Sequence, residues 1–151
     1  MTKNMKVLIA LVALLALVRV GHYLYYNTDL ISHSRIQIIK SNRPSFRNRF
    51  APDVYPVLFT LDGEYRLTAV KVVPAAALAT NKHPVALWRL VTKSNSPPLK
   101  GFYYGQRIPG MVPFQTNAPP KGLQPNVTYR LFIEAGRARG EKDFQAQAVS
   151  E

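Results

Sequence analysis

The sequence predicts an all-β fold, a two-sheet sandwich, that follows a single N-terminal membrane-spanning helix. The helix is indicated by an unbroken apolar run, residues 7–18 (VLIALVALLALV), behind a start that carries two lysines. The sandwich is indicated by short runs of alternating apolar and polar residues from position 54 onward, separated by turn residues. No amphipathic helical period appears after residue 30, and AAALAT, residues 75–80, is too short to form a helix by itself.

The composition is strongly basic and lacks cysteine. The 151 residues include 20 Lys and Arg against 8 Asp and Glu, which gives a net charge of +12. Such a surplus favours polyanionic partners: anionic lipid, acidic polysaccharide, an acidic protein face or nucleic acid. The positive charges are spread evenly along the chain, which argues against a dedicated nucleic-acid-binding arm. Without cysteine, disulfides, thiolate metal sites, a lipid anchor on Cys and cysteine nucleophiles are excluded.

Residues 1–26 are predicted to be a signal anchor, an uncleaved helix that stays in the membrane. A helix from Met5 to Tyr26 measures about 33 Å and spans a hydrocarbon core of roughly 30 Å. Arg19 lies in its outer half, where a long side chain reaches the headgroups. The lysines at the start place the N-terminus in the cytoplasm and the rest of the chain on the outer or periplasmic side. Two alternatives stay open: an export signal that is cleaved, although its small-x-small pattern is poor, and a helix buried in a larger assembly.

Residues 27–53 are predicted to be a basic linker between the helix and the sandwich. SNRPSFRNRFAP, residues 41–52, has the composition of a loop, whereas SRIQIIK, residues 34–40, alternates well enough for a short strand or an amphipathic segment. Basic residues beside a membrane contact anionic headgroups. The candidate membrane contacts are Arg19, Arg35, Lys40, Arg43, Arg47 and Arg49. A solvated tether is the alternative interpretation.

The sandwich is predicted over residues 54–148, with residues 149–151 as a short tail. Its first apolar run, VYPVLFTLD, ends in an Asp-Gly turn. In EYRLTAVKVVP the apolar parity changes after Leu67, which predicts a bulge near Ala69. The predicted strands lie within residues 54–62, 64–74, 84–93, 99–105, 122–136 and 137–148.

A tyrosine corner is predicted at the start of one late strand. Leu123, Pro125 and Tyr129 form a Leu-x-Pro-x-x-x-Tyr pattern within GLQPNVTYRLFIEAG, residues 122–136. In this device the Tyr hydroxyl forms a hydrogen bond to the backbone a few residues upstream and pins the crossing between the sheets of a Greek-key sandwich. From Tyr129 onward, apolar residues occupy every second position, as a strand with one buried face requires.

This segment resembles fibronectin type III domains, which are Greek-key sandwiches similar to the immunoglobulin fold. Trp88 resembles the core Trp on the family's second strand, and residues 97–102 (PPLKGF) resemble its turn into the third strand. The resemblance covers roughly residues 64–148. It implies that residues 99–105 lie beside the strand that begins at Tyr129. It also implies a binding or spacing module, although fold does not determine function.

Two protein-contact sites are predicted as hypotheses. Arg130 and Phe132 point away from the buried face of their strand, and Tyr103 is expected on the adjacent strand, so that aromatic residues flank an arginine. Met111 and Phe114 lie in a Pro- and Gly-rich connection that would insert into a partner or a membrane. In the alternative interpretation, other segments of the same chain cover the first site, and the second pair caps the sandwich core.

No motif for catalysis, metal binding or cofactor binding is present. His22, His33 and His83 have no neighbours at ligand spacing, and neither Gly-x-Ser-x-Gly nor a glycine-rich phosphate loop occurs. We therefore expect no catalytic, cofactor-binding or metal-binding residues. The expected function is a non-enzymatic, membrane-anchored envelope protein, an accessory or assembly subunit that contacts a protein partner or a larger membrane complex through its sandwich. The alternative is an exported adhesion or polysaccharide-binding module that is released after signal cleavage.

Overall fold

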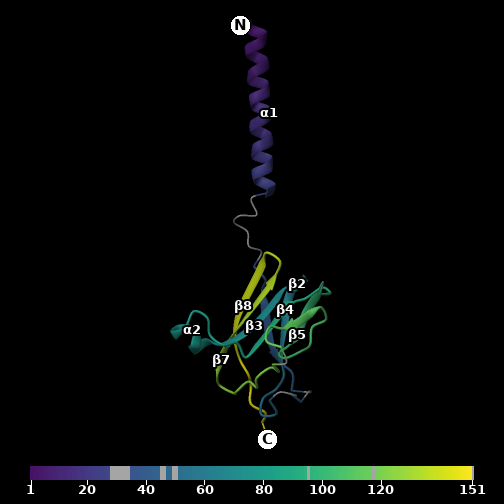
Figure 1. Cartoon of the computed structure of the whole chain (residues 1–151), viewed down its shortest axis with the longest axis vertical. Helices are drawn as coiled ribbons and strands as arrows, with labels where there is room; N and C mark the ends of the chain where they lie inside the picture. The colour runs from purple at the N-terminus through teal and green to yellow at the C-terminus, as the bar shows by residue number, and fades with distance from the viewer. Residues whose placement is uncertain (28–34, 45–46, 49–50, 95, 117, 151) are drawn as a thin grey trace. The chain divides into compact units, whose positions relative to one another are not determined.

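The computed structural model of the chain describes residues 1–27, 35–44, 47–48, 51–94, 96–116 and 118–150. The chain divides into two units, Met1–His33 and Ser34–Glu151. The first contains helix α1, Lys3–Asn27, and the second contains two β-sheets (Figure 1). The predicted arrangement, mostly β structure after one apolar N-terminal helix, is confirmed.

Helix α1 is long and apolar enough to cross a membrane. Its segment Lys3–Leu24 comprises 22 residues, which at 1.5 Å per residue span about 33 Å, slightly more than a hydrocarbon core of roughly 30 Å. No part of its apolar stretch is buried within the structure, and Leu8, Leu14 and Leu17 are 64%, 62% and 70% exposed. An export signal near an N-terminus has the same length and composition, so these properties fit both a membrane anchor and a signal.

The smaller sheet contains three antiparallel strands in the order β1-β2-β5. Their bounds are β1 Ile38–Asn42, β2 Val57–Tyr65 and β5 Leu99–Tyr103. β1 lies within residues 27–53, the predicted linker, and it overlaps residues 34–40, for which a short strand or an amphipathic segment was expected. The strand belongs to the sandwich. The reason is the alternation of Ile36 and Ile38, which are 2% and 6% exposed and belong to the hydrophobic core of the sandwich.

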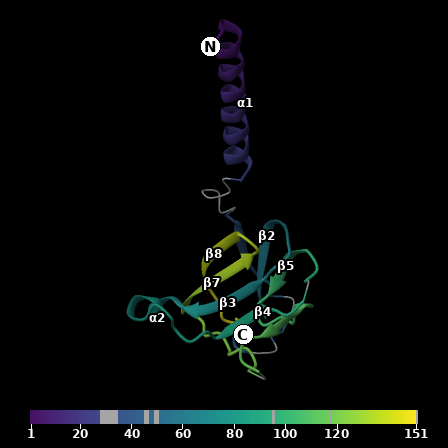
Figure 2. The same cartoon turned by 45° about the horizontal axis from the view of Figure 1, so that its top comes forward.

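The larger sheet contains five antiparallel strands in the order β6-β4-β3-β7-β8. Their bounds are β3 Ala69–Pro74, β4 Trp88–Thr92, β6 Met111–Pro113, β7 Thr128–Ala135 and β8 Ala138–Gln145. Figure 2 shows β8, β7, β3 and β4 side by side in this sheet. A short helix, α2, Ala75–Thr80, follows β3 directly and lies against β3 and β7. We expected no helix in this segment because six residues are too few for a helix that persists alone, and the structure shows a short one beside two strands.

The chain passes from the smaller sheet to the larger between Tyr65 and Ala69. The sequence predicted a bulge here because the apolar parity changes after Leu67. The structure shows another cause: the side chains change parity because the chain leaves one sheet and enters the other. The predicted Asp-Gly turn also differs, since Asp62 and Gly63 both lie inside β2.

Aromatic side chains form the centre of the core. Between ring centroids, Phe59 of β2 lies 5.6 Å from Phe102 of β5 and 4.9 Å from Phe144 of β8. Trp88 of β4 lies 6.1 Å from Phe102 and 5.3 Å from Tyr104. These residues come from both sheets and are at most 5% exposed, so their contacts join the two sheets across the core.

The segment before β2 pairs with the end of the chain. The Tyr55 N–H donates to the Gln147 carbonyl at 2.9 Å, and the Val149 N–H donates to the Asp53 carbonyl at 3.0 Å. We predicted residues 149–151 to be a tail, and the structure shows that the first of them is bonded to the sandwich. The last strand and the residues after it are therefore held by segments from the beginning of this unit.

Candidate functional site

The Leu-x-Pro-x-x-x-Tyr segment forms a corner where the chain enters β7. Tyr129 is 3% exposed, and its hydroxyl accepts a hydrogen bond from the backbone N–H of Gln124, five residues upstream, at 2.9 Å. Leu123 is 4% exposed, and Pro125 forms an isolated bridge to Ala146. The hydrogen bond predicted from the sequence pattern is present, and it joins the loop before β7 to the start of that strand.

Trp88 is a core residue, but it does not lie on the second strand. It begins β4, which lies between β3 and β6 in the larger sheet. Its ring meets that of Tyr104 edge-on, and the Tyr104 hydroxyl donates to the Lys121 carbonyl at 2.5 Å. Burial, with a smaller contribution from nearby Tyr129, raises the pKa of Tyr104 well above its ordinary value. Tyr104 therefore fastens the connection between β6 and β7 to the core as a neutral donor.

The predicted patch of Tyr103, Arg130 and Phe132 does not assemble. Tyr103 ends β5 and pairs with Leu58 in the smaller sheet, whereas β7 lies between β3 and β8 in the larger sheet. The expectation that residues 99–105 lie beside β7 is therefore wrong. The pattern of a single strand determines which face is buried, but it does not determine which strand pairs with it.

Arg130 already has an acidic partner within the chain. Its Nε and Nη2 atoms donate to the two carboxylate oxygens of Asp143 on β8, at 2.6 Å and 3.0 Å. The hydrogen bond to Arg130 lowers the pKa of the Asp143 carboxyl group, and the same contact raises the pKa of the guanidinium. Such a bidentate pair uses the donors that an external carboxylate would need. Arg130 is thus a poor candidate for anchoring a partner.

A row of outward-facing side chains crosses the larger sheet at Arg89, Lys71, Phe132 and Glu141. The register pairs Arg89 with Lys71, Lys71 with Phe132, and Phe132 with Glu141. On β4, β3 and β7 the flanking residues are buried in the core, so these side chains lie on the opposite, outer face. Arg89 and Lys71 are directly opposite each other, and like charges in this position destabilise a sheet. Phe132 separates them from Glu141.

Met111 and Phe114, predicted as one exposed pair, lie in different environments. Met111 begins β6 and is 6% exposed, so its predicted role as an exposed contact is wrong. Phe114 follows β6 and is 55% exposed. Its N–H donates to the Arg89 carbonyl at 3.0 Å, and the Arg89 guanidinium carbon lies 3.7 Å from the centre of its ring. This is a cation–π contact at the surface of the protein.

A small groove opens beside this stacked pair. Its volume is about 180 Å³. One side is formed by residues 84–89, the last two of which begin β4. The other side is formed by the end of β6 and residues after it: Pro113, Phe114, Gln115, Ala118, Pro119 and Lys121. Its three charged lining residues, Lys71, Arg89 and Lys121, are all cationic. This groove combines exposed apolar surface with uncompensated positive charge, and it is the candidate functional site. Sequence reasoning missed it because its residues come from separate segments that meet only through the strand register.

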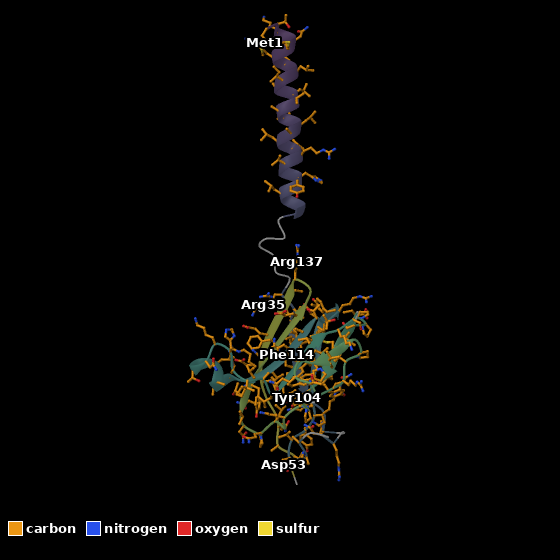
Figure 3. The ribbon with its side chains drawn as sticks, viewed as in Figure 1. Met1, Arg35, Asp53, Tyr104, Phe114 and Arg137 are labelled. Atoms are coloured by element: carbon orange, nitrogen blue, oxygen red, sulfur yellow. The ribbon has the colours of Figure 1, made fainter. Side chains whose placement is uncertain are left out.

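The basic residues predicted to contact headgroups do not form one continuous linker. Arg35 bridges Arg139 on β8, and Figure 3 shows Arg35 and Asp53 at opposite ends of the sandwich unit. β1 then carries the chain along the sheet, with half-buried Lys40 opposite Phe59. The remaining members are Arg43 and Arg47, which are exposed beyond the end of β1, Arg19, which lies in α1, and Arg49, which is outside the described residues. Contact of these side chains with lipid stays a prediction.

Within the described residues, no group of three or more His, Asp or Glu side chains is placed to hold a metal ion. The backbone N–H of His83 donates to the side chain of Asn81 at 2.9 Å, and the Asp62 carboxylate accepts from the Tyr65 hydroxyl at 2.9 Å. His33 lies outside the described residues. These contacts are those of ordinary turns and strand ends.

No protein-family model, curated protein or solved structure matches this chain. Function is therefore inferred from the properties of the helix, the sandwich and the groove themselves. Fold alone would not decide it, because sandwiches host many unrelated activities.

Proposed function

We propose that the protein is a non-enzymatic, membrane-anchored subunit of the cell envelope whose sandwich makes protein–protein contacts as an accessory or assembly factor. The observation that carries this proposal is α1, a helix of membrane-spanning length whose apolar side chains are exposed on every side. So much apolar surface is unfavourable in water and favourable in lipid. The helix belongs to a different unit from the sandwich, so the sandwich does not need it to complete its core.

We infer that the sandwich is a Greek-key domain of the fibronectin type III or immunoglobulin type. If the strands are lettered in chain order, β1, β2 and β5 take the positions of strands A, B and E in one sheet. β4, β3, β7 and β8 take those of C′, C, F and G in the other, with β6 added at the edge. The tyrosine corner at the start of β7 supports the same assignment, because this device occurs at the start of strand F. Domains of this type are commonly used for contacts between proteins.

The proposed orientation places the N-terminus in the cytoplasm and the sandwich on the outer side of the membrane. Lys3, Lys6 and the amino terminus lie at the start of α1, and positive charge is retained on the cytoplasmic side. Arg19, near the other end, would extend to the outer headgroups. The absence of cysteine from the chain also suits an oxidising compartment, since no thiol is present to form an incorrect disulfide.

The first test is the intact mass of the protein extracted in mild detergent from its own membranes. The proposal expects a chain that retains residues 1–26 and that migrates with a fixed partner in native mass spectrometry. A soluble chain that lacks these residues and carries no partner would show that α1 is a cleaved signal. That result would favour the alternative, an exported adhesion or polysaccharide-binding module.

The orientation has a separate test, because a cysteine-free chain accepts a single reporter thiol without background. Thr2→Cys and Ser150→Cys variants are exposed to a membrane-impermeant maleimide in intact and in permeabilised cells. We expect Ser150→Cys to react in intact cells and Thr2→Cys to react only after permeabilisation. The reverse pattern would contradict the proposed orientation.

One observation bears on the polysaccharide alternative. An exposed aromatic ring beside basic residues, as at Phe114, is found in sites for acidic sugars as well as in protein interfaces. Sugar rings bind best to a free aromatic platform, however, and here the single Trp of the chain, Trp88, is 5% exposed within the core. One face of the Phe114 ring is also covered by Arg89. We therefore retain the protein-contact function as the first proposal.

A further inference from the structure

We propose that the groove beside Arg89 and Phe114 binds an acidic side chain from an extended segment of a protein partner. This inference rests on the proposed function and names the chemistry of the partner. It depends on three properties of the groove: its charge, the fixed position of Arg89, and its size and apolar rim.

The first property is uncompensated positive charge. Lys71 and Arg89 lie directly opposite each other on neighbouring strands, and Lys121 approaches from the connection after β6. Among the described residues that line the groove, none is acidic. Like charges that face each other in a sheet repel, so an arriving carboxylate relieves repulsion as well as forming new contacts.

Acidic residues also occur on the outer face of the sheet, on β7 and β8, and two of them lie beside arginines. Asp143 is held by Arg130, and Glu134 lies 3.9 Å from Arg139, measured between charged atoms. Glu141 is separated from Lys71 by Phe132 in the same cross-strand row. The acids of the outer face thus lie on β7 and β8, whereas Arg89 on β4 and Lys71 on β3 present positive charge to the groove. This distribution favours an acidic partner at the groove.

The second property is the fixed position of the Arg89 side chain. Its guanidinium lies over the Phe114 ring at 3.7 Å, and the backbone of the same two residues is joined by a hydrogen bond of 3.0 Å. The N–H groups of a guanidinium point outward in the plane of the group. When one face of the guanidinium lies on an aromatic ring, these N–H groups stay available and match the two oxygens of a carboxylate. Less side-chain freedom is lost on binding when the arginine is already held in this way.

The third property is the size and rim of the groove. Its volume of about 180 Å³ is below the roughly 300–1,000 Å³ of sites that enclose whole small-molecule ligands. It suits one side chain of a larger partner. Val85, 73% exposed, and Pro119 lie beside the cations and offer apolar contact to the flanking residues of an extended segment.

The experiment measures binding of a fluorescent deca-glutamate peptide to the full chain in nanodiscs of zwitterionic lipid, by fluorescence anisotropy. Two variants, Lys71→Gln and Arg89→Gln, remove one groove charge each, and Arg139→Gln removes one charge from β8 as the matched control. We expect each groove variant to weaken binding by about tenfold and the control to change it less than about twofold. A deca-glutamine peptide should not bind.

A fourth variant separates geometry from charge. Phe114→Leu keeps every charge and removes the ring that holds Arg89, so we expect it to weaken binding by about threefold to tenfold. The fluorescence of Trp88, which is buried in the core, reports whether each variant is folded. Equal weakening by the groove variants and by Arg139→Gln would show a diffuse effect of net charge and would overturn the inference.

Two further probes decide the source of the carboxylate. A polygalacturonate polymer that binds through Arg89 while deca-glutamate does not would identify an acidic polysaccharide as the occupant. Binding of neither deca-glutamate nor polygalacturonate, or binding only of vesicles that contain anionic lipid, would likewise overturn the proposal.

Failure of this inference is distinguishable from failure of the proposed function. If the chain stays anchored with a partner whose association is unchanged in Arg89→Gln, the groove is not the contact and the membrane-anchored function stands. If the chain is cleaved and released but still binds deca-glutamate through Arg89, the groove stands and the anchored function does not.

Discussion

Replacement of Tyr129 by phenylalanine tests the corner at the start of β7. The substitution keeps the buried ring, which lies 5.8 Å from the ring of Phe144, and removes only the hydroxyl that accepts from the Gln124 N–H at 2.9 Å. A buried donor left without its partner costs about 1–3 kcal/mol. Because Gln124 itself is exposed, water reaches this N–H in part, and we expect a loss of about 1–2 kcal/mol.

The assay is urea unfolding of the full chain in mild detergent, followed by the fluorescence of Trp88, the single tryptophan. With an ordinary m-value for a domain of this size, the midpoint should fall by about 0.5–1 M without a change in slope. Tyr55→Phe is the matched control, because its hydroxyl contacts Ser150 at 3.3 Å in an exposed position, and we expect a loss of at most about 0.5 kcal/mol. A loss for Tyr129→Phe no greater than that of the control would refute the reasoning.

Three further predictions concern stability. Gly101→Ala places a methyl group 2.8 Å from a backbone oxygen of β2 and should lower the free energy of unfolding by about 1–3 kcal/mol. Gly63→Ala is the control, because its methyl group would meet no atom closer than 3.5 Å, and it should be tolerated. Equal effects of the two substitutions in urea unfolding would contradict this prediction. Arg130 lowers the pKa of Asp143 in the folded state, so the pair makes a small contribution to the free energy of unfolding that is present above about pH 4 and is lost as the pH falls below that value. Asp143→Asn should therefore make the free energy of unfolding fall less steeply at acid pH. Because burial raises the pKa of Tyr104, the free energy of unfolding should be retained below about pH 10 and should decline above it as this tyrosine ionises in the unfolded chain. In Tyr104→Phe the free energy of unfolding should decline less steeply at alkaline pH. The same steepness in both proteins would refute this prediction.

The corner was predictable because its determinants are close together in the chain. Leu123, Pro125 and Tyr129 lie within seven positions, and the strand that follows alternates cleanly from buried Tyr129 through Leu131 to Ile133. A pattern of this kind reports both a local hydrogen bond and the buried face of one strand. Neither depends on distant parts of the sequence.

Strand pairing was not predictable in the same way. The segment with Phe102 resembles a strand that lies beside β7, but the chain pairs it with β2. Both sheets accept the same alternation of apolar and polar residues, so the pattern does not choose between them. Trp88 was placed in the core correctly and on the wrong strand for this reason.

The boundary of the sandwich was hidden by composition. β1 contributes Ile38 to the core, and Ile36 precedes it, but the surrounding arginines, asparagines and prolines are typical of a linker. Two buried isoleucines are a weak signal. The groove had one local signal, Phe114 in the Pro- and Gly-rich connection. Its cations had none, because Lys71 and Arg89 are brought to Phe114 only by the register of β3, β4 and the chain after β6.

The pairing of the first and last parts of the sandwich has a consequence for its biogenesis. The Asn42 side chain donates to that of Gln147, 105 residues later, and the Tyr55 hydroxyl meets that of Ser150, 95 residues later. Contacts of such long range form slowly, and they cannot form while the later residues are still being synthesised. These contacts between the first and last parts of the sandwich would therefore form only when nearly all of the chain has left the ribosome. In the orientation that we propose, the sandwich would therefore complete these contacts only after it has crossed the membrane.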